Sequence, residues 1–135
     1  MKSPFTYFTK GIFGIAFLFS LAATSSYSQI QHSYDVDKVC KLEELNFAHT
    51  DYRGIESRDE VIYYVENDLQ TMTAYKNGGI LWQVNIIEAC GIPKDGKPAI
   101  RYFRLEPKKL HITYGKHRFA GVDFVDGKVT CLGLD

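Results

Sequence analysis

The sequence lacks the short motifs that would assign it a reaction. It has no G-x-S-x-G, H-E-x-x-H or C-x-x-C motif and no glycine-rich loop of the kind that holds phosphate groups. Its three cysteines lie far apart, so none has the close spacing of a zinc site. Acidic and basic residues are equal in number, 16 of each, which gives no indication of a polyanionic partner. We therefore expect no metal, no cofactor and no nucleic acid.

Long hydrophobic runs are also scarce, and the only one lies near the N-terminus. Gly11–Ala23 is apolar, Lys2 and Lys10 precede it, and small residues follow around Ser26-Tyr27-Ser28. This pattern predicts a signal peptide over residues 1–28, although a retained N-terminal anchor is the alternative. We expect residues 29–135 to form a single β-rich domain that is exported, either periplasmic or secreted.

Cysteine is rare, and Cys40, Cys90 and Cys131 all lie in the part expected to be exported. An oxidising compartment permits one disulfide and leaves one thiol over. The sequence allows all three pairings. We favour Cys90–Cys131, because both are expected on strands of one compact sheet. The alternative is that all three are small buried hydrophobic residues.

The most regular stretch is residues 61–85, which predicts three strands joined by two tight turns. Asn77-Gly78 suits a two-residue turn with positive φ at both positions, and Asn67-Asp68 is a second turn signal. Both faces of these strands carry apolar side chains, so we expect both to be covered. The first turn implies these opposed pairs: Tyr75 with Ile80, Thr73 with Trp82, and Thr71 with Val84.

The second half of the chain repeats this construction. Turn residues fill 90–98, and further turns are expected at Glu106-Pro107, Gly115-Lys116 and Asp126-Gly127. The implied pairs are Leu105 with Leu110, Phe103 with Ile112, Ile112 with Phe119, and Val122 with Cys131. This register needs a β-bulge at Ala120-Gly121, because the inward parity changes there. A constant offset also aligns the two halves, which is consistent with a duplicated three-strand unit.

Residues 35–46 give a rough helical stripe of apolar side chains, with Ser33 or Asp35 placed to cap the start. Residues 47–59 are polar and are expected to form a loop. The predicted fold is therefore mainly β, an antiparallel meander of about seven strands with one N-terminal helix. The alternative is a cystatin-like α+β fold in which the sheet wraps around that helix.

One local resemblance is carried by Asn67-Asp68-Leu69, Thr73-Ala74-Tyr75, Gly78 and Leu81-Trp82. This order of small, aromatic, turn, aliphatic and tryptophan residues resembles one blade of the quinoprotein-type (PQQ-like) β-propeller repeat. The chain is too short for the several blades of a propeller. The resemblance therefore implies shared hairpin chemistry, and it implies neither a cofactor nor a function.

Charge is unevenly distributed along the chain. Acidic residues exceed basic ones over 35–68, and basic residues exceed acidic ones over 92–118. In the expected register several polar and basic side chains share one sheet face, which suits an anionic or sugar-like ligand. Alternatively, the acidic segment lies against this face, or the charges keep edge strands soluble. The candidate binding residues are Tyr102, Arg104, His111, Thr113 and Arg118.

These observations favour a non-enzymatic exported binding module that contacts an envelope or extracellular partner. A structural, oligomerising envelope protein is the alternative, with the first hairpins as its interface. A small envelope hydrolase is the least favoured class. It would need a pocket in which His111 or His49 lies within hydrogen-bond reach of an acid.

Overall fold

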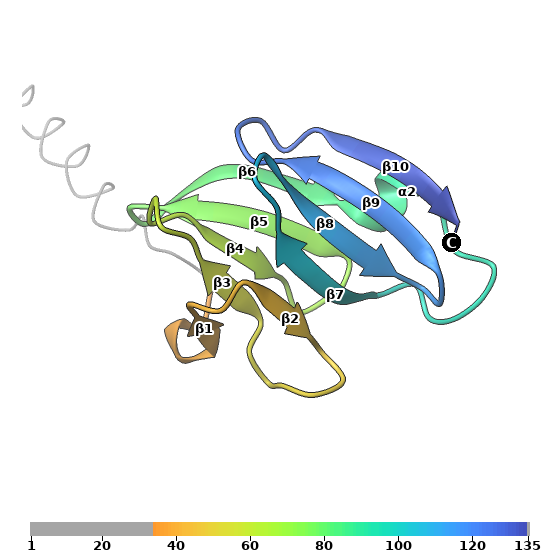
Figure 1. Cartoon of the computed structure of the whole chain (residues 1–135), viewed down its shortest axis with the longest axis horizontal. Helices are drawn as coiled ribbons and strands as arrows, with labels where there is room; N and C mark the ends of the chain where they lie inside the picture. The colour runs from red at the N-terminus through yellow and green to blue at the C-terminus, as the bar shows by residue number, and fades with distance from the viewer. Residues whose placement is uncertain (1–33, 135) are drawn as a thin grey trace, which may run out of the picture. The chain divides into compact units, whose positions relative to one another are not determined.

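The computed structural model describes residues 34–134 (Figure 1). This part of the chain contains ten strands in two five-stranded sheets and one short α-helix. The prediction of a mainly β fold is confirmed, whereas the single meander of about seven strands is wrong. The cystatin-like alternative is also wrong, since residues 34–134 contain no long helix for a sheet to wrap around.

The first sheet has the strand order β1-β3-β4-β5-β6. β1 runs parallel to β3, and the other neighbours are antiparallel. The strands are β1 (Val39–Cys40), β3 (Gly54–Glu56), β4 (Ile62–Val65), β5 (Thr71–Lys76) and β6 (Gly79–Asn85).

The second sheet has the order β10-β9-β8-β7-β2 and is antiparallel throughout. A short helix, α2 (Ile86–Cys90), follows β6 and leads toward this sheet. The strands are β2 (Glu44–Asn46), β7 (Ile100–Leu105), β8 (Lys109–Tyr114), β9 (Arg118–Asp123) and β10 (Val129–Leu134).

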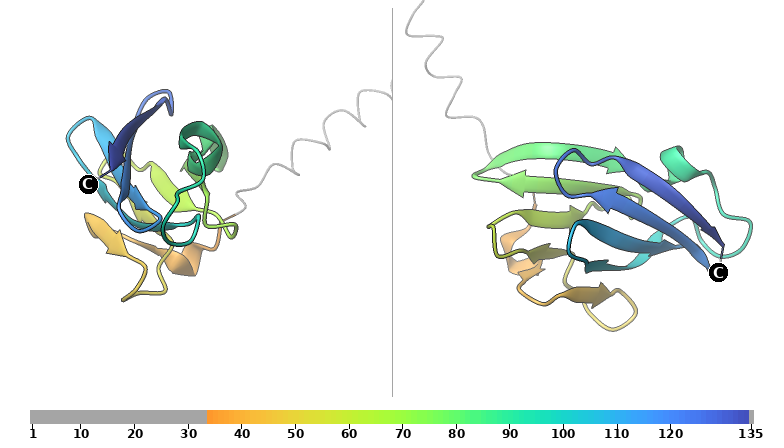
Figure 2. Two further views of the ribbon diagram at one scale, coloured as in Figure 1. Left: turned by 90° about the vertical axis from the view of Figure 1, so that its right-hand side faces the viewer. Right: turned by 45° about the horizontal axis from the view of Figure 1, so that its top comes forward.

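The two sheets lie face to face and enclose one hydrophobic core (Figure 2). Both sheets and α2 contribute side chains to this core. Each strand therefore needs to bury only one of its two faces there. The fully buried members are Ile55, Val65, Met72, Ala74, Ile86, Phe103, Leu110, Ile112, Ala120 and Val122.

The predicted N-terminal helix over residues 35–46 is wrong. The segment forms a 3-10 turn (Val36–Lys38) followed by β1 and β2. Two residues of the expected apolar stripe, Val36 and Leu42, are 55% and 56% exposed, whereas Leu45 is buried opposite Phe103. A helix this short is marginal alone, so strand pairing with β7 decides the conformation.

The region predicted as a loop, residues 47–59, contains β3. Ile55 is its one apolar side chain and is completely buried. Gly54 lets the strand approach β4, because a Cβ there would lie 2.6 Å from the Tyr64 ring. A strand with a single apolar residue gives no alternating pattern, and sequence periodicity therefore missed it.

The register of the first hairpins is confirmed in part. Tyr75 faces Ile80 across the turn, as expected, and β4 pairs with β5 with Ile62 opposite Tyr75. A bulge then shifts the pairing, so that Trp82 lies opposite Ala74 instead of Thr73. The shift turns Trp82 to the core side, where it is 7% exposed.

In the second sheet the β7–β8 pairs Phe103–Ile112 and Leu105–Leu110 are confirmed. The expected pair of Ile112 with Phe119 is wrong: Ile112 lies opposite Ala120, and Phe119 lies opposite Thr113. The turn after β8 is one residue longer than assumed, and β9 needs no bulge against β8. On the far side of β9, Cys131 pairs with Ala120 instead of Val122.

The favoured disulfide, Cys90–Cys131, is present. Cys90 ends α2 instead of lying on a strand, so the bridge ties this helix to β10. Cys40 has a free thiol, which donates a hydrogen bond of 3.5 Å to the carbonyl of Gly54.

Candidate functional site

The candidate site is the outer face of the second sheet, defined here by Tyr102, Arg104, His111, Thr113 and Phe119. Strand pairing aligns these side chains in two rows across β7, β8 and β9. Tyr102, Thr113 and Phe119 form one row, and Arg104 and His111 begin the other. Because Phe103 and Ile112 point into the core from the intervening positions, these five point away from it.

Four of the five residues predicted for this face are therefore on it, and Arg118 is not. Arg118 lies opposite Tyr114, whose side chain is buried in the core. The longer turn after β8 moves β9 by one residue, and a shift of one residue exchanges the two faces of a strand. The same shift brings Phe119 to the outer face, where sequence reasoning had not placed it.

The arginine of this face is already paired with an acid. Nε and Nη2 of Arg104 donate to Oε2 of Glu106, at 3.1 and 2.8 Å. This hydrogen bonding holds the pKa of Glu106 below its ordinary value. A ligand at this face would therefore meet Arg104 as half of a neutral ion pair and not as a free positive charge.

A second acid comes from β2, beside β7. Glu44 lies opposite Arg104, and its Oε2 accepts a hydrogen bond of 3.1 Å from the Tyr102 hydroxyl. Sequence reasoning missed Glu44 because it assigned this segment to a helix. The sequence signal for a strand in this segment is the single apolar Leu45 between the polar residues Glu44 and Asn46.

His111 lies between aromatic and charged neighbours. Its ring centroid is 5.4 Å from that of Phe119. Burial lowers the pKa of His111, and the positive charges of Arg104 and Lys109 lower it further, while Glu106 acts in the opposite direction. His111 is therefore neutral at pH 7, and presents one donor and one acceptor nitrogen.

The best-formed depressions in the described part of the chain lie away from this face. Four of them are lined by residues of 34–134, and none of the four includes any of the five defining residues. Thr113 is 6% exposed, whereas Tyr102, His111 and Phe119 are half-buried. Small-molecule sites are usually concave, so this geometry fits an extended or flat ligand better.

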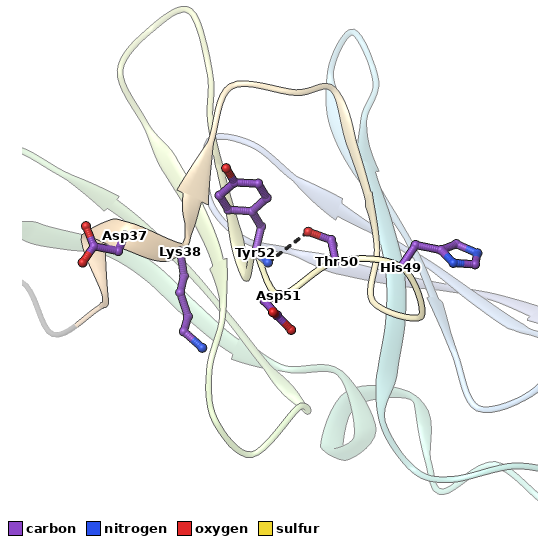
Figure 3. A pocket seen from close by; sticks show the side chains of 6 residues that line it. All are labelled: Asp37, Lys38, His49, Thr50, Asp51 and Tyr52. Carbon is purple, nitrogen blue, oxygen red and sulfur yellow. Dashed lines mark hydrogen bonds between the residues drawn. The ribbon is translucent and has the colours of Figure 1, made fainter.

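One depression elsewhere, of about 550 Å³, contains a histidine (Figure 3). The side chains around it do not converge, and the imidazole of His49 points away from Asp51. The one hydrogen bond drawn there joins the Tyr52 amide to Thr50 Oγ1, at 3.1 Å. Among the described residues neither His49 nor His111 donates a hydrogen bond to an acid, so the hydrolase hypothesis finds no support here. The lining residues are Asp37, Lys38, His49, Thr50, Asp51 and Tyr52.

Residues 34–134 contain no group of three or more His, Cys, Asp or Glu side chains placed to hold a metal ion. Nor do they contain a helix of the length and hydropathy needed to span a membrane.

Comparison of the chain with protein-family models, curated proteins and solved structures finds no match.

Proposed function

We propose that this protein is an exported binding module whose ligand is an extended glycan, held on the outer face of the second sheet. The observation that carries the proposal is the composition of that face. Two half-buried aromatic side chains, Tyr102 and Phe119, lie beside hydrogen-bonding groups on an open surface. The apolar face of a sugar ring can pack on an aromatic ring, while its hydroxyls bond to polar neighbours.

The charges favour a glycan over a purely anionic ligand. Arg104 is bonded to Glu106, and Glu44 accepts from Tyr102. An incoming anion would meet these two carboxylates as well as the cations Arg104 and Lys109. Hydroxyl groups, in contrast, can donate to a carboxylate and accept from a guanidinium, so they use both kinds of charge.

Export is part of the same proposal. Residues 1–28 carry the signal-peptide pattern, and the Cys90–Cys131 bridge suits an oxidising compartment. Glycans are abundant at cell surfaces, where a module with an open binding face can bind a polymer along its length.

Binding can be measured by affinity electrophoresis and pull-down with neutral and acidic polysaccharides, each at low and high salt. We expect binding that depends weakly on salt and weakens about tenfold or more in Tyr102→Ala or Phe119→Ala, because each removes a stacking surface. Tyr52→Ala is the matched control, since Tyr52 is 40% exposed outside this face. Equal loss in the control, or binding only to acidic polymers and abolished by salt, would contradict the proposal.

A structural, oligomerising role is the second candidate. It is favoured by a different observation, the open edge of the first sheet.

A further inference from the structure

One end of the molecule carries a local excess of positive charge. The loop between α2 and β7, residues 91–99, lies at this end beside the turn between β8 and β9 (Figure 1). Asp95 is the one acid in the loop and the turn. Acids and bases are equal in number over the whole chain, so the excess is a property of this place. Four exposed cations form what we call the basic end: Lys94, Lys97, Arg101 and Lys116.

Backbone contacts hold the loop and the turn together. The amide of Lys116 donates to the carbonyl of Asp95, at 3.1 Å. Gly96 allows this approach, because a Cβ there would lie 2.7 Å from the Lys116 amide nitrogen. Pro93 is buried, and its ring lies so close to Gly115 that a Cβ on this glycine would be 2.7 Å from it. The fold therefore fixes the backbone from which the lysines of the basic end extend into solvent.

The guanidinium of Arg101 is held in the same place. Its Nε donates to the carbonyl of Gly115 at 2.8 Å, and its Nη2 donates to the carbonyl of Lys116. Both acceptors are uncharged, so they orient the guanidinium without neutralising it. Within residues 34–134 the one ion pair joins Arg104 to Glu106. The four cations of the basic end are therefore not paired with any described acid.

An exposed apolar side chain belongs to the same loop. Ile92 is 74% exposed, directly before the buried Pro93. A large apolar residue beside several cations suits a lipid surface, because the apolar group can enter the headgroup region while the cations lie near the lipid phosphates. A soluble polyanion would use the cations and gain nothing from Ile92. The combination favours a membrane over a polymer in solution.

We propose that the basic end is a contact site for a lipid surface with negatively charged headgroups, which Ile92 enters. The cations supply most of the attraction, since each Lys or Arg close to such a surface strengthens binding about fivefold. A single isoleucine is a small anchor, so the contact is reversible and depends on salt. The proposal does not rest on glycan binding, because the basic end lies outside the five residues that define the candidate face.

Co-sedimentation with vesicles tests the proposal. The vesicles contain phosphatidylcholine alone, or phosphatidylcholine with one third phosphatidylglycerol. The exported form, residues 29–135, is used, because the apolar run Gly11–Ala23 would bind lipid by itself. This form contains both sheets and their whole described core. We expect it to bind only the vesicles with phosphatidylglycerol, and to be released near 1 M salt, where the screening length is about 3 Å.

Paired lysine variants locate the contact. Lys94→Gln/Lys97→Gln should lower the affinity for these vesicles about tenfold or more, because two cations are lost from the contact. Lys76→Gln/Lys128→Gln is the matched control and should bind like the wild type. Both control lysines are exposed, in the β5–β6 turn and the β9–β10 loop at the other end of the molecule (Figure 1). Circular dichroism checks that all variants fold.

Ile92→Gln separates a lipid surface from a soluble polyanion. It should weaken vesicle binding several-fold and leave binding to polyphosphate unchanged. No effect of Ile92→Gln on vesicle binding would assign the cations to a soluble polyanion and overturn the proposal. Absence of vesicle binding, equal binding to neutral vesicles, or equal loss in the control pair would also overturn it. Tyr102→Ala should keep full vesicle binding, so failure of the glycan proposal is distinguished from failure of this one.

Discussion

Removal of the Cys90–Cys131 disulfide should cost this small domain a large part of its stability. The bridge joins residues 41 apart in the sequence. In the chain-entropy model, closure of a loop of that length removes about 13 cal/mol/K from the unfolded chain, or about 4 kcal/mol at 25 °C. Domains of this size are usually stable by about 5–15 kcal/mol, so the loss is a substantial fraction of the total.

The folded state should add little to that loss. Cys131 is exposed, and its replacement by alanine opens no cavity in the core. The Cα atoms of the two cysteines are 5.6 Å apart, a usual separation for a disulfide, so the fold need not move when the bridge is absent. The structure therefore assigns most of the effect to the unfolded chain.

Urea unfolding followed by the fluorescence of Trp82, the single tryptophan, measures the effect. The Cys90→Ala/Cys131→Ala variant and the reduced wild type should both lose about 4 kcal/mol in free energy of unfolding. Cys40→Ala is the control: it removes a half-buried thiol without opening a loop, and should lose about 1 kcal/mol. A loss below about 1 kcal/mol in the double variant would refute the loop argument.

Two further predictions concern single residues around Trp82 and Tyr63. A Cβ at Gly127 would lie 2.7 Å from the Trp82 ring. Gly127→Ala should therefore lower the free energy of unfolding in urea by about 2 kcal/mol more than Gly78→Ala does. Gly78 is the control because it has a similar positive φ and open space around it. Equal losses would show that the ring moves aside freely. Burial, and to a lesser degree Asp59, raises the pKa of Tyr63 to about 12, so the folded state retains a proton that the unfolded chain releases near pH 10. Stability should therefore fall as pH rises from 10 to 12, and Tyr63→Phe should fall less steeply in urea unfolding measured across that range.

The sequence predicted the parts of the fold that are formed by neighbouring segments. The turn at Asn77-Gly78 has positive φ at both positions, and the β4–β5 and β7–β8 pairs follow from alternation of apolar residues. Local turn chemistry and period-two patterning are sufficient for such hairpins.

The parts it missed depend on contacts between distant segments. β2 pairs with β7, more than fifty residues later, and one buried side chain, Leu45, secures it. β1 pairs in parallel with β3, which no hairpin turn specifies. A local sequence pattern contains no information about partners that lie far away along the chain. The helical spacing of apolar residues over 35–46 was therefore the stronger signal there.

At the candidate site, prediction depended on the length of one turn. Tyr102, Arg104, His111 and Thr113 precede the turn after β8 and share the expected face, whereas Arg118 follows it and does not. One extra turn residue exchanged Arg118 for Phe119. The face consequently lost a cation and gained a ring, and this exchange is the reason that we propose a glycan where the sequence left an anionic ligand open.

The two sheets have similar strand arrangements, but different groups cover their outer faces. One constant offset in residue number carries β5, Thr71–Lys76, onto β8, Lys109–Tyr114, and it also carries the last residue of β6 onto the last residue of β9. The matching positions Met72 and Leu110 both point into the core. This agreement in strand bounds and faces is what the duplication of a three-strand unit would leave.

The outer faces of the two units have diverged. On the first sheet, Tyr34 packs on Tyr75 and Tyr64, with ring centroids 4.7 and 5.7 Å away, and both of these tyrosines are almost fully buried. On the second sheet the positions that match Tyr64 and Tyr75 are Tyr102, which is half exposed, and Thr113, which is 6% exposed. His111, which matches the fully buried Thr73, is also half exposed. If one unit copied the other, the first now uses its outer face for its own packing, while the second has kept an open face.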